Sequence, residues 1–237
     1  MKLLLILVVL ASNIVWGEWI EPPASSAKGY LVPTPDYVPV LPQDHGSHPE
    51  HGIEWWYWVG HLNAVHSEKD FGFQSTIFRL AGDPEKSGVT QSEPFGNQNL
   101  FLVHTALSDF KEEKYIHHER VMREGWQARS SEKTLSLTVG GVKVNLLEEE
   151  DGHKVVTRYP DGAKLELTFK PTKPLVSFGD RGLSRKGADP ASVSWYWSYT
   201  RLQAKGTLFQ NGEEIAVEGI AWMDHEISSS QLGEDLA

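Results

Sequence analysis

Hydrophobic and polar residues alternate along most of the chain after residue 52, with the period of two that is typical of β-strands. Nine segments show this alternation or a dense run of aromatic and β-branched residues, namely 53–63, 70–80, 99–110, 114–122, 133–149, 153–160, 163–171, 192–209 and 213–226. Turn sequences such as Pro160-Asp161-Gly162 and Asn211-Gly212 separate them. Helical periodicity is nearly absent. The pattern predicts an all-β, antiparallel barrel or sandwich, and a barrel offers its mouth or interior to a ligand.

Two of the predicted strands are unusually aromatic. In the first, Glu54, Trp56 and Trp58 share one face, whereas Trp55 and Tyr57 belong to the other. In the strand at 192–209, Trp195, Trp197 and Tyr199 share a face. These aromatic walls have two interpretations: packing within the barrel core, or a slot for a long apolar ligand whose reaction develops positive charge.

The segment Ala221–Glu226 combines aromatic and acidic residues near the end of the chain. As a strand it would direct Trp222, Asp224 and Glu226 to one side, which we expect to lie inside, and Met223 and His225 to the other. Carboxyl groups that are close together or in an apolar pocket have raised pKa values, and a protonated carboxyl group can act as a general acid. The alternative is a structural pair bonded to arginines such as Arg79 or Arg201.

Composition excludes some partners. The formal net charge is −10 and no long block of Lys or Arg occurs, so binding to nucleic acid is not expected. Lys2 and the apolar run at 3–16 precede Val15-Trp16-Gly17, which predicts a signal peptide at 1–17, with a retained membrane anchor as the alternative. We therefore expect a periplasmic or secreted protein, and with no cysteine it relies on its core alone. Residues 18–42 are proline-rich and predict an extended lead-in.

Common catalytic motifs are absent from the sequence, including the G-x-S-x-G elbow, the P-loop and H-E-x-x-H. Four residues of a loop could ligate a metal, but we interpret them as turn-capping or surface groups and predict no metal site; they are Asp44, His45, His48 and His51. The basic loop at 179–190 could hold an anion, although pairing of its arginines with the acidic excess is favoured.

Taken together, several stretches resemble the family that contains AttH and the hydroxyneurosporene synthases (carotenoid 1,2-hydratases, CrtC), whose members are often described as secreted hydrolases. The stretches are DHGSHPEHGIEWWYWVGHL (44–62), FGFQSTIFRL (71–80), HTALSD (104–109), GDRGLSRKGADP (179–190), SWYWSYTRL (194–202) and GIAWMDHE (219–226). The resemblance implies two tandem lipocalin-like β-barrels. Residues 43–227 would form the first, and 228–237 would begin a second that is absent from this chain.

The resemblance also implies a chemistry. In the carotenoid hydratases, water adds across a terminal C=C bond without a cofactor. Asp224 would be the proton donor, with Glu226 and His225 beside it. The implied substrate-binding residues are Trp222, Trp56, Tyr57, Trp195, Tyr196 and Trp197. The sequence departs from the family pattern at His225, where Arg is usual, and at Ile227, where Trp is usual.

Two functions remain open at this point. The chain could be a hydratase or hydrolase-like enzyme that acts on a hydrophobic small molecule. Alternatively, it could be a non-catalytic carrier of such a molecule, or an accessory to ABC-type export with membrane-associated partners.

Overall fold

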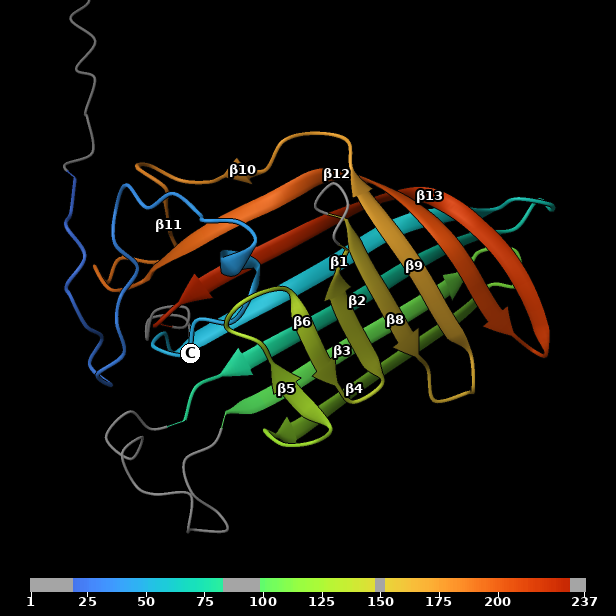
Figure 1. Cartoon of the computed structure of the whole chain (residues 1–237), viewed down its shortest axis with the longest axis horizontal. Coiled ribbons are helices and arrows are strands. Elements are labelled where there is room, and N and C mark those ends of the chain that lie inside the picture. The colour runs from blue at the N-terminus through green and yellow to red at the C-terminus, as the bar shows by residue number, and fades with distance from the viewer. Residues whose placement is uncertain (1–18, 83–98, 148–151, 231–237) are drawn as a thin grey trace, which may run out of the picture.

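The computed structural model describes residues 19–82, 99–147 and 152–230 (Figure 1). These residues contain one 3-10 turn, η1 (Gln43–His45), and thirteen strands. The strands are β1 (Ile53–Ala64), β2 (Asp70–Leu80), β3 (Leu100–Asp109), β4 (Lys114–Arg123), β5 (Ala128–Ser130), β6 (Ser136–Val139), β7 (Val142–Leu146), β8 (His153–Arg158), β9 (Lys164–Pro171), β10 (Val176–Ser177), β11 (Leu183–Arg185), β12 (Val193–Gln210) and β13 (Glu213–Ser228).

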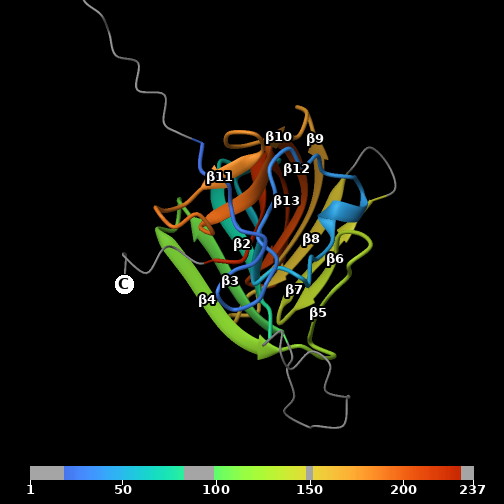
Figure 2. The same cartoon turned by 90° about the vertical axis from the view of Figure 1, so that its left-hand side faces the viewer.

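The strands form a single antiparallel sheet in the order β4-β3-β2-β1-β13-β12-β9-β8-β7-β6-β5, with β10 and β11 paired to β12. The sheet curls until β3 approaches β6, so that a nearly closed barrel results (Figure 2). This confirms the predicted all-β antiparallel class. One predicted segment, 133–149, is in fact a hairpin of β6 and β7, because Gly140 adopts a positive φ of 59° that allows a tight turn.

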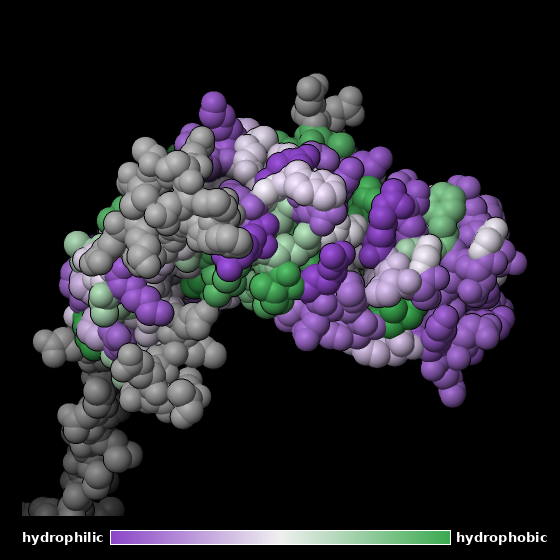
Figure 3. All heavy atoms as spheres, turned by 90° about the horizontal axis from the view of Figure 1, so that it is seen from below, coloured by the Kyte–Doolittle hydropathy of each residue, from purple (hydrophilic) through white to green (hydrophobic). Residues whose placement is uncertain are grey.

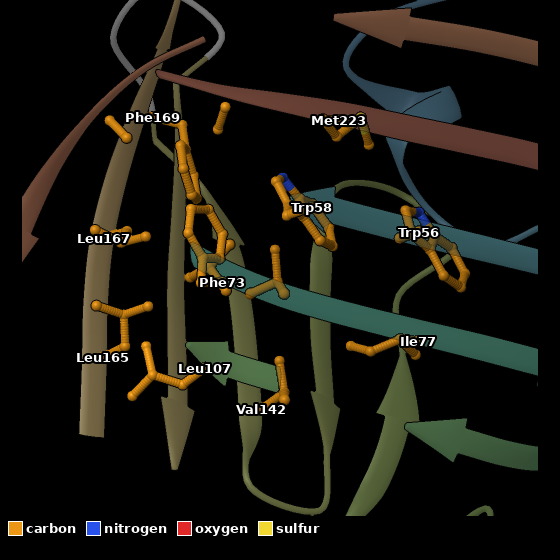
Figure 4. Packing of buried hydrophobic residues seen from close by; sticks show 14 of the residues in the cluster. Trp56, Trp58, Phe73, Ile77, Leu107, Val142, Leu165, Leu167, Phe169 and Met223 are labelled. Carbon is orange, nitrogen blue, oxygen red and sulfur yellow. The ribbon is translucent and has the colours of Figure 1, made fainter. Parts of the chain in front are cut away.

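The barrel interior is filled by the inward-facing residues of alternating strands. Trp56 and Trp58 on β1 are completely buried, and Met223 of β13 lies across from Trp58. In the close-up, Phe73 lies beside Phe169 of β9, with ring centroids 5.9 Å apart, and both belong to the same apolar core as Leu107 (Figure 4). The period-two alternation of the sequence thus produces a packed core. For Trp56 and Trp58, the interpretation as core residues is therefore correct.

The proline-rich lead-in packs across one end of the barrel, where it appears in blue (Figure 2). Tyr37 stacks on Trp195 with ring centroids 3.9 Å apart, and Trp195 Nε1 donates a hydrogen bond of 2.7 Å to the carbonyl oxygen of Thr34. Val32, Leu183 and Ile227 join this second apolar cluster. The described part of the lead-in contains turns at 27–28, 35–36 and 41–42, and it closes the barrel end that is opposite the β12–β13 hairpin.

The other end of the barrel is polar, as the purple side chains at the right of Figure 3 show. An open cleft of about 510 Å³ lies there, lined by Lys69, Asp109, Glu112, Glu113, Lys114, Gln210, Asn211 and Glu213. This lining of charged and amide groups does not suit an apolar ligand.

Within the described ranges, we find no helix with the length and apolar character needed to cross a bilayer. The predicted signal peptide at 1–17 and residues 231–237 lie outside the described residues. The last strand, β13, ends at Ser228.

Close packing of two strands at Gly206 yields a stability prediction. A Cβ at this position would collide with the backbone carbonyl of Glu166 across the β9–β12 pairing. We expect Gly206→Ala to lower the free energy of unfolding by about 2 kcal/mol or more, measured by urea denaturation. Gly125→Ala is the matched control, because nothing lies within 4 Å of its Cβ. Equal stabilities of the two variants would contradict the tight strand contact.

Candidate functional site

Strand β13 divides the predicted catalytic residues between two sides of the barrel wall. Its register places Tyr57, Asp224 and Ser198 in one cross-strand row, and Trp56, His225 and Trp197 in the next. Neighbouring rows face opposite ways. His225 and Met223 are completely buried on the inner face, whereas Asp224 and Trp222 are half-buried on the outer face. The expectation that the acidic and aromatic side faces inward was wrong, because apolar Met223 packs into the core instead.

On the outer face, three hydrogen-bond donors converge on one oxygen of Asp224. Oδ1 accepts hydrogen bonds from Ser198 Oγ, from Trp222 Nε1 and, at 3.1 Å, from the hydroxyl of Tyr196. Among the described residues, no donor reaches Oδ2. The carboxyl group is therefore held in one orientation with its second oxygen available. Tyr57 lies directly across from it on β1, where burial and the charge of Asp224 raise the pKa of the tyrosine.

Glu226 occupies the next row of the same outer face and is 3% exposed. Ser194 Oγ donates a 2.6 Å hydrogen bond to its Oε1, and Lys186 Nζ lies 2.6 Å from the same oxygen. Burial raises the pKa of Glu226, although Lys186 and Ser194 oppose the shift. The predicted partners Arg79 and Arg201 were wrong: the cation comes from the 179–190 loop. In the same loop Arg181 pairs with Asp36, as the acidic-excess interpretation requires.

Tyr196 lies between the two carboxyl groups. Phe178 stacks on its ring at 4.7 Å, and Lys186 Nζ sits 4.8 Å from the ring centroid on the outer face. Burial, together with the charge of Asp224, raises the pKa of the Tyr196 hydroxyl to about 12, so this group remains a hydrogen-bond donor at neutral pH.

An apolar row leads away from this site over the outer face. Cross-strand pairing aligns Glu226 with Trp55 of β1, Phe78 of β2, Leu102 of β3 and Val121 of β4. The ring centroids of Trp55 and Phe78 are 6.0 Å apart, and Val121 is 68% exposed. We call Trp55, Phe78, Leu102 and Val121 the outer apolar row.

The six aromatic residues predicted to bind substrate do not share one surface. Tyr57, Tyr196 and Trp222 are on the outer face with Asp224. Trp56, Trp195 and Trp197 are buried on the inner face or beneath the lead-in, with exposures of 8% or less. The structure therefore brings the first three together and separates them from the last three by the thickness of the sheet.

The inner face carries a second polar cluster centred on Glu54, which is completely buried. Glu54 Oε1 lies 2.8 Å from both His48 Nδ1 and His225 Nε2. Arg79 Nε donates to Glu54 Oε2 at 3.1 Å, and the backbone N–H of His48 reaches the same oxygen at 2.9 Å. Arg79 also donates to the carbonyl oxygens of His48 and His51. We call His48, Glu54, Arg79 and His225 the inner cluster.

The charges of the inner cluster follow from these contacts. Burial by itself would raise the pKa of Glu54, but hydrogen bonds from His225 and His48 and the charge of Arg79 hold it far below its ordinary range. Burial lowers the pKa of His225 and outweighs the attraction of Glu54. For His48 the balance is reversed, because Glu54 and Asp44 raise its pKa by more than burial lowers it. Glu54 is therefore ionised and His225 is neutral.

The loop histidines interpreted as turn-capping or surface groups are in fact buried. His45, His48 and His51 are 0%, 9% and 2% exposed, because the loop folds into the barrel end that the lead-in covers. Sequence reasoning also missed His153, which is completely buried and within 5.4 Å of the His45 ring centroid. Only strand pairing brings β8 to this point. One feature of the sequence could have indicated this buried polar cluster: the acidic residue Glu54, which shares a strand face with Trp56 and Trp58.

The two buried histidines His45 and His153 yield a pH prediction. Burial lowers their pKa values to about 4 and about 3, with a further contribution from neighbouring histidines. The unfolded chain takes up these protons below about pH 6.5, whereas the folded chain does not, so stability falls as pH decreases from about 6.5 to 4. Each such histidine contributes up to about 1.4 kcal/mol per pH unit to the slope.

We expect His153→Asn to make this slope shallower by up to about 1.4 kcal/mol per pH unit, measured by urea unfolding between pH 4.5 and 6. Exposed His66→Asn serves as the control and should leave the slope unchanged. A slope in His153→Asn equal to that of the parent chain would show that His153 is not held neutral.

Comparisons with known proteins agree with this barrel. A search of curated proteins finds no match. A crystal structure of a protein assigned as AttH from Nitrosomonas europaea is 31% identical, with a TM-score of 0.70 over 84% of this chain. Kievitone hydratase from Nectria haematococca is 16% identical, with a TM-score of 0.56 over 90% of this chain, which shows a shared fold. This chain spans 58% of the length of each of these two structures.

The family model described as AttH-like matches residues 32–237, which include the last part of the lead-in from residue 32, the inner cluster, and Asp224 and Glu226 on the outer face. The architecture is accordingly the lipocalin-like barrel that the resemblance implied, and the chain belongs to the AttH-like family.

Proposed function

We propose that this domain binds an elongated apolar molecule on the outer face of the barrel and adds water to one of its C=C bonds. The observation that carries the proposal is the carboxyl group of Asp224, whose Oδ1 is fixed by three donors while no described donor reaches Oδ2. A proton on Oδ2 would face the ligand side of a surface bordered by Trp222, Tyr57 and Tyr196. A bound apolar ligand that excludes water would favour uptake of a proton at Oδ2, and a carboxyl group protonated there acts as a general acid, which typically contributes about 10²–10⁴-fold to a rate.

The reaction balances without a cofactor. The proton of Asp224 Oδ2 forms a C–H bond to one alkene carbon with the π electrons, which leaves a tertiary cation on the other carbon. A water oxygen attacks this cation and forms the C–O bond. The resulting oxonium ion loses its proton to the Asp224 carboxylate, which restores the acid. The net change is addition of one water molecule.

The surrounding rings suit the cation in this scheme. The faces of Trp222 and Tyr57 attract positive charge, with a contribution of about 0.5–2 kcal/mol for each well-placed ring. The Tyr196 hydroxyl stays protonated because burial and Asp224 raise its pKa. Glu226 is neutralised by Lys186, so we assign it to the positioning of Tyr196 and the outer wall, and not to the first proton transfer.

The outer apolar row supports the substrate class. Trp55, Phe78, Leu102 and Val121 extend from the carboxyl site over four strands. A linear hydrocarbon chain that lies along them would bury apolar surface at a gain of about 25 cal/mol per Å². Acyclic isoprenoids of the carotenoid type combine such a chain with a terminal trisubstituted alkene, and we propose them as the substrate class. An exported location and a second lipocalin-like domain as a partner belong to the same proposal.

The matching relatives support a hydratase-like role at the level of the family. The AttH-like match covers the proposed site, and one protein with the same fold is named as a hydratase. These relatives are longer than this chain, and hydratase activity of this chain is part of the proposal.

A second candidate function is a non-catalytic carrier or an accessory to ABC-type export. Exposed apolar side chains on the outer face favour it, since Leu100, Tyr115 and Val121 are 37%, 66% and 68% exposed. Such a surface could hold a hydrophobic cargo or contact a membrane-associated partner without any chemistry at Asp224.

Substitution of the acid distinguishes the two functions. We expect Asp224→Asn to reduce hydration of an acyclic carotenoid such as neurosporene by about 10²–10⁴-fold, with ligand affinity nearly unchanged. Incorporation of ¹⁸O from labelled water measures the reaction. Glu218→Gln, on an exposed part of the same strand, is the control. Turnover in Asp224→Asn equal to that of the parent chain would exclude the acid role, whereas binding without turnover in the parent chain would favour the carrier.

Substitution on the outer apolar row tests where the ligand lies. We expect Val121→Lys to weaken binding of a fluorescent polyene several-fold while leaving stability nearly unchanged, because this side chain is 68% exposed. Val65→Lys, at an exposed valine in the β1–β2 turn, is the matched control. Equal affinities of the two variants would place the ligand away from the outer apolar row.

A further inference from the structure

The proposed function leaves the inner cluster without a role, although this cluster holds the most concentrated set of ligating groups in the described part of the chain. His48 lies in the loop after η1, Glu54 is the second residue of β1, and His225 lies on β13. Their ligating atoms are all within 4.8 Å of one another. All three side chains are at least nine-tenths buried. They face away from Asp224, on the other side of the strand.

The arrangement is close to what a small transition-metal ion requires. Zn–N and Zn–O bonds are about 2.0–2.2 Å long, so ligand atoms around a tetrahedral ion are about 3.4 Å apart. Two imidazole nitrogens already point at the same oxygen, Glu54 Oε1, each at 2.8 Å. An ion between the three groups would require them to open by about 0.5 Å, which is within the reach of side-chain rotation.

A supporting shell surrounds the three groups. The second ring nitrogen of His48, Nε2, is 3.6 Å from Asp44 Oδ1, so a small rotation would give the carboxylate–histidine hydrogen bond found behind many metal ligands. Arg79 and the backbone N–H of His48 occupy Glu54 Oε2 and so leave Oε1 to the imidazoles. Trp56 stacks on His225 at 4.9 Å and Trp197 meets its edge at 5.1 Å, which fixes the ring and excludes water.

The carboxylates near the site also suit a cation. Glu54 and Asp44 are both buried on either side of His48, and the single guanidinium of Arg79 pairs with Glu54. His45, which interacts electrostatically with His225, is completely buried, and its Nδ1 has no hydrogen-bond partner within the described residues. This nitrogen is not among the atoms of His48, Glu54 and His225 that lie within 4.8 Å of one another, so the proposal leaves it out.

We propose that His48, Glu54 and His225 bind one divalent transition-metal ion of the zinc class, which fastens the loop at 46–52 to β1 and β13. Two nitrogen donors and one carboxylate select Zn²⁺, Co²⁺ or Fe²⁺ over Ca²⁺ and Mg²⁺, which prefer oxygen ligands only. The ion would stabilise the end of the barrel that the lead-in covers. It takes no part in the chemistry proposed for Asp224, which lies on the opposite face.

Metal stoichiometry tests the proposal on the full chain. After treatment with a chelator, the protein is dialysed against Zn²⁺ or Co²⁺, and bound metal is counted by mass spectrometry. We expect one equivalent per chain, a visible Co²⁺ absorption spectrum typical of nitrogen and oxygen ligands, and a melting temperature that rises on loading. Ca²⁺ should not bind.

Variants locate the ion. Glu54→Gln and His225→Gln should reduce occupancy to below about a tenth. If either fails to fold, His48→Gln gives the same test at the edge of the cluster, where the side chain is 10% exposed and the Glu54–Arg79 pair stays in place. Asp44→Asn should weaken affinity by about 10–100-fold through the orientation of His48. His117→Gln on strand β4 is the control and should retain the full equivalent.

Two outcomes would overturn the proposal. One is a folded parent chain that takes up less than about a tenth of an equivalent of both Zn²⁺ and Co²⁺, which would make the inner cluster a purely structural hydrogen-bond network. The other is a full equivalent that persists in folded His48→Gln, which would place the ion elsewhere in the chain.

Discussion

The buried carboxylate of Glu54 joins strands β1, β2 and β13 and the loop that precedes β1. Glu54 is the second residue of β1, accepts a hydrogen bond from the guanidinium of Arg79 on β2, and contacts His225 of β13 and His48 of the loop after η1. An isolated charge in such a place would cost many kcal/mol, so the surrounding donors must be present together. Arg79 in turn donates to two carbonyl oxygens of the His48 loop. The closed end of the barrel therefore depends on this one group being fully paired.

Strand β13 connects that structural centre with the proposed chemistry. Successive side chains of β13 point to opposite faces, so His225 lies in the inner cluster and Asp224 lies on the outer face. Rigid support of His225 by Trp56, Trp197 and Glu54 fixes the backbone from which Asp224 projects. A site on a well-anchored strand keeps its geometry more accurately than one on a loop. The inner cluster can thus matter to function without touching a ligand.

The two faces also differ in how they meet solvent. The inner face is a packed core, whereas the outer face leaves Val121 and Tyr115 exposed beside half-buried Trp55 and Phe78. Apolar surface of this kind usually marks a place where another molecule binds. In this barrel, the convex wall is consequently the better candidate for ligand contact than the filled interior, which is an unexpected location for a lipocalin-like fold.

Local pattern in the sequence determined the strands, most of the turns and the facing of residues within each strand, because period two is a property of the extended backbone itself. Alternation alone therefore groups Trp56 and Trp58 with Glu54, and Asp224 with Trp222. Which group faces the core was decided only by the fold: the apolar content of the Trp222–Asp224 side resembles that of the Met223–His225 side, and pairing with Trp58 settled the choice. The partners of the charged residues were likewise beyond the sequence. Glu54 pairs with Arg79, which is 25 positions away, and with His225, which is 171 positions away. Glu226 pairs with Lys186, which is 40 positions away. The local sequence around a residue does not indicate a partner that only the closure of the sheet brings close.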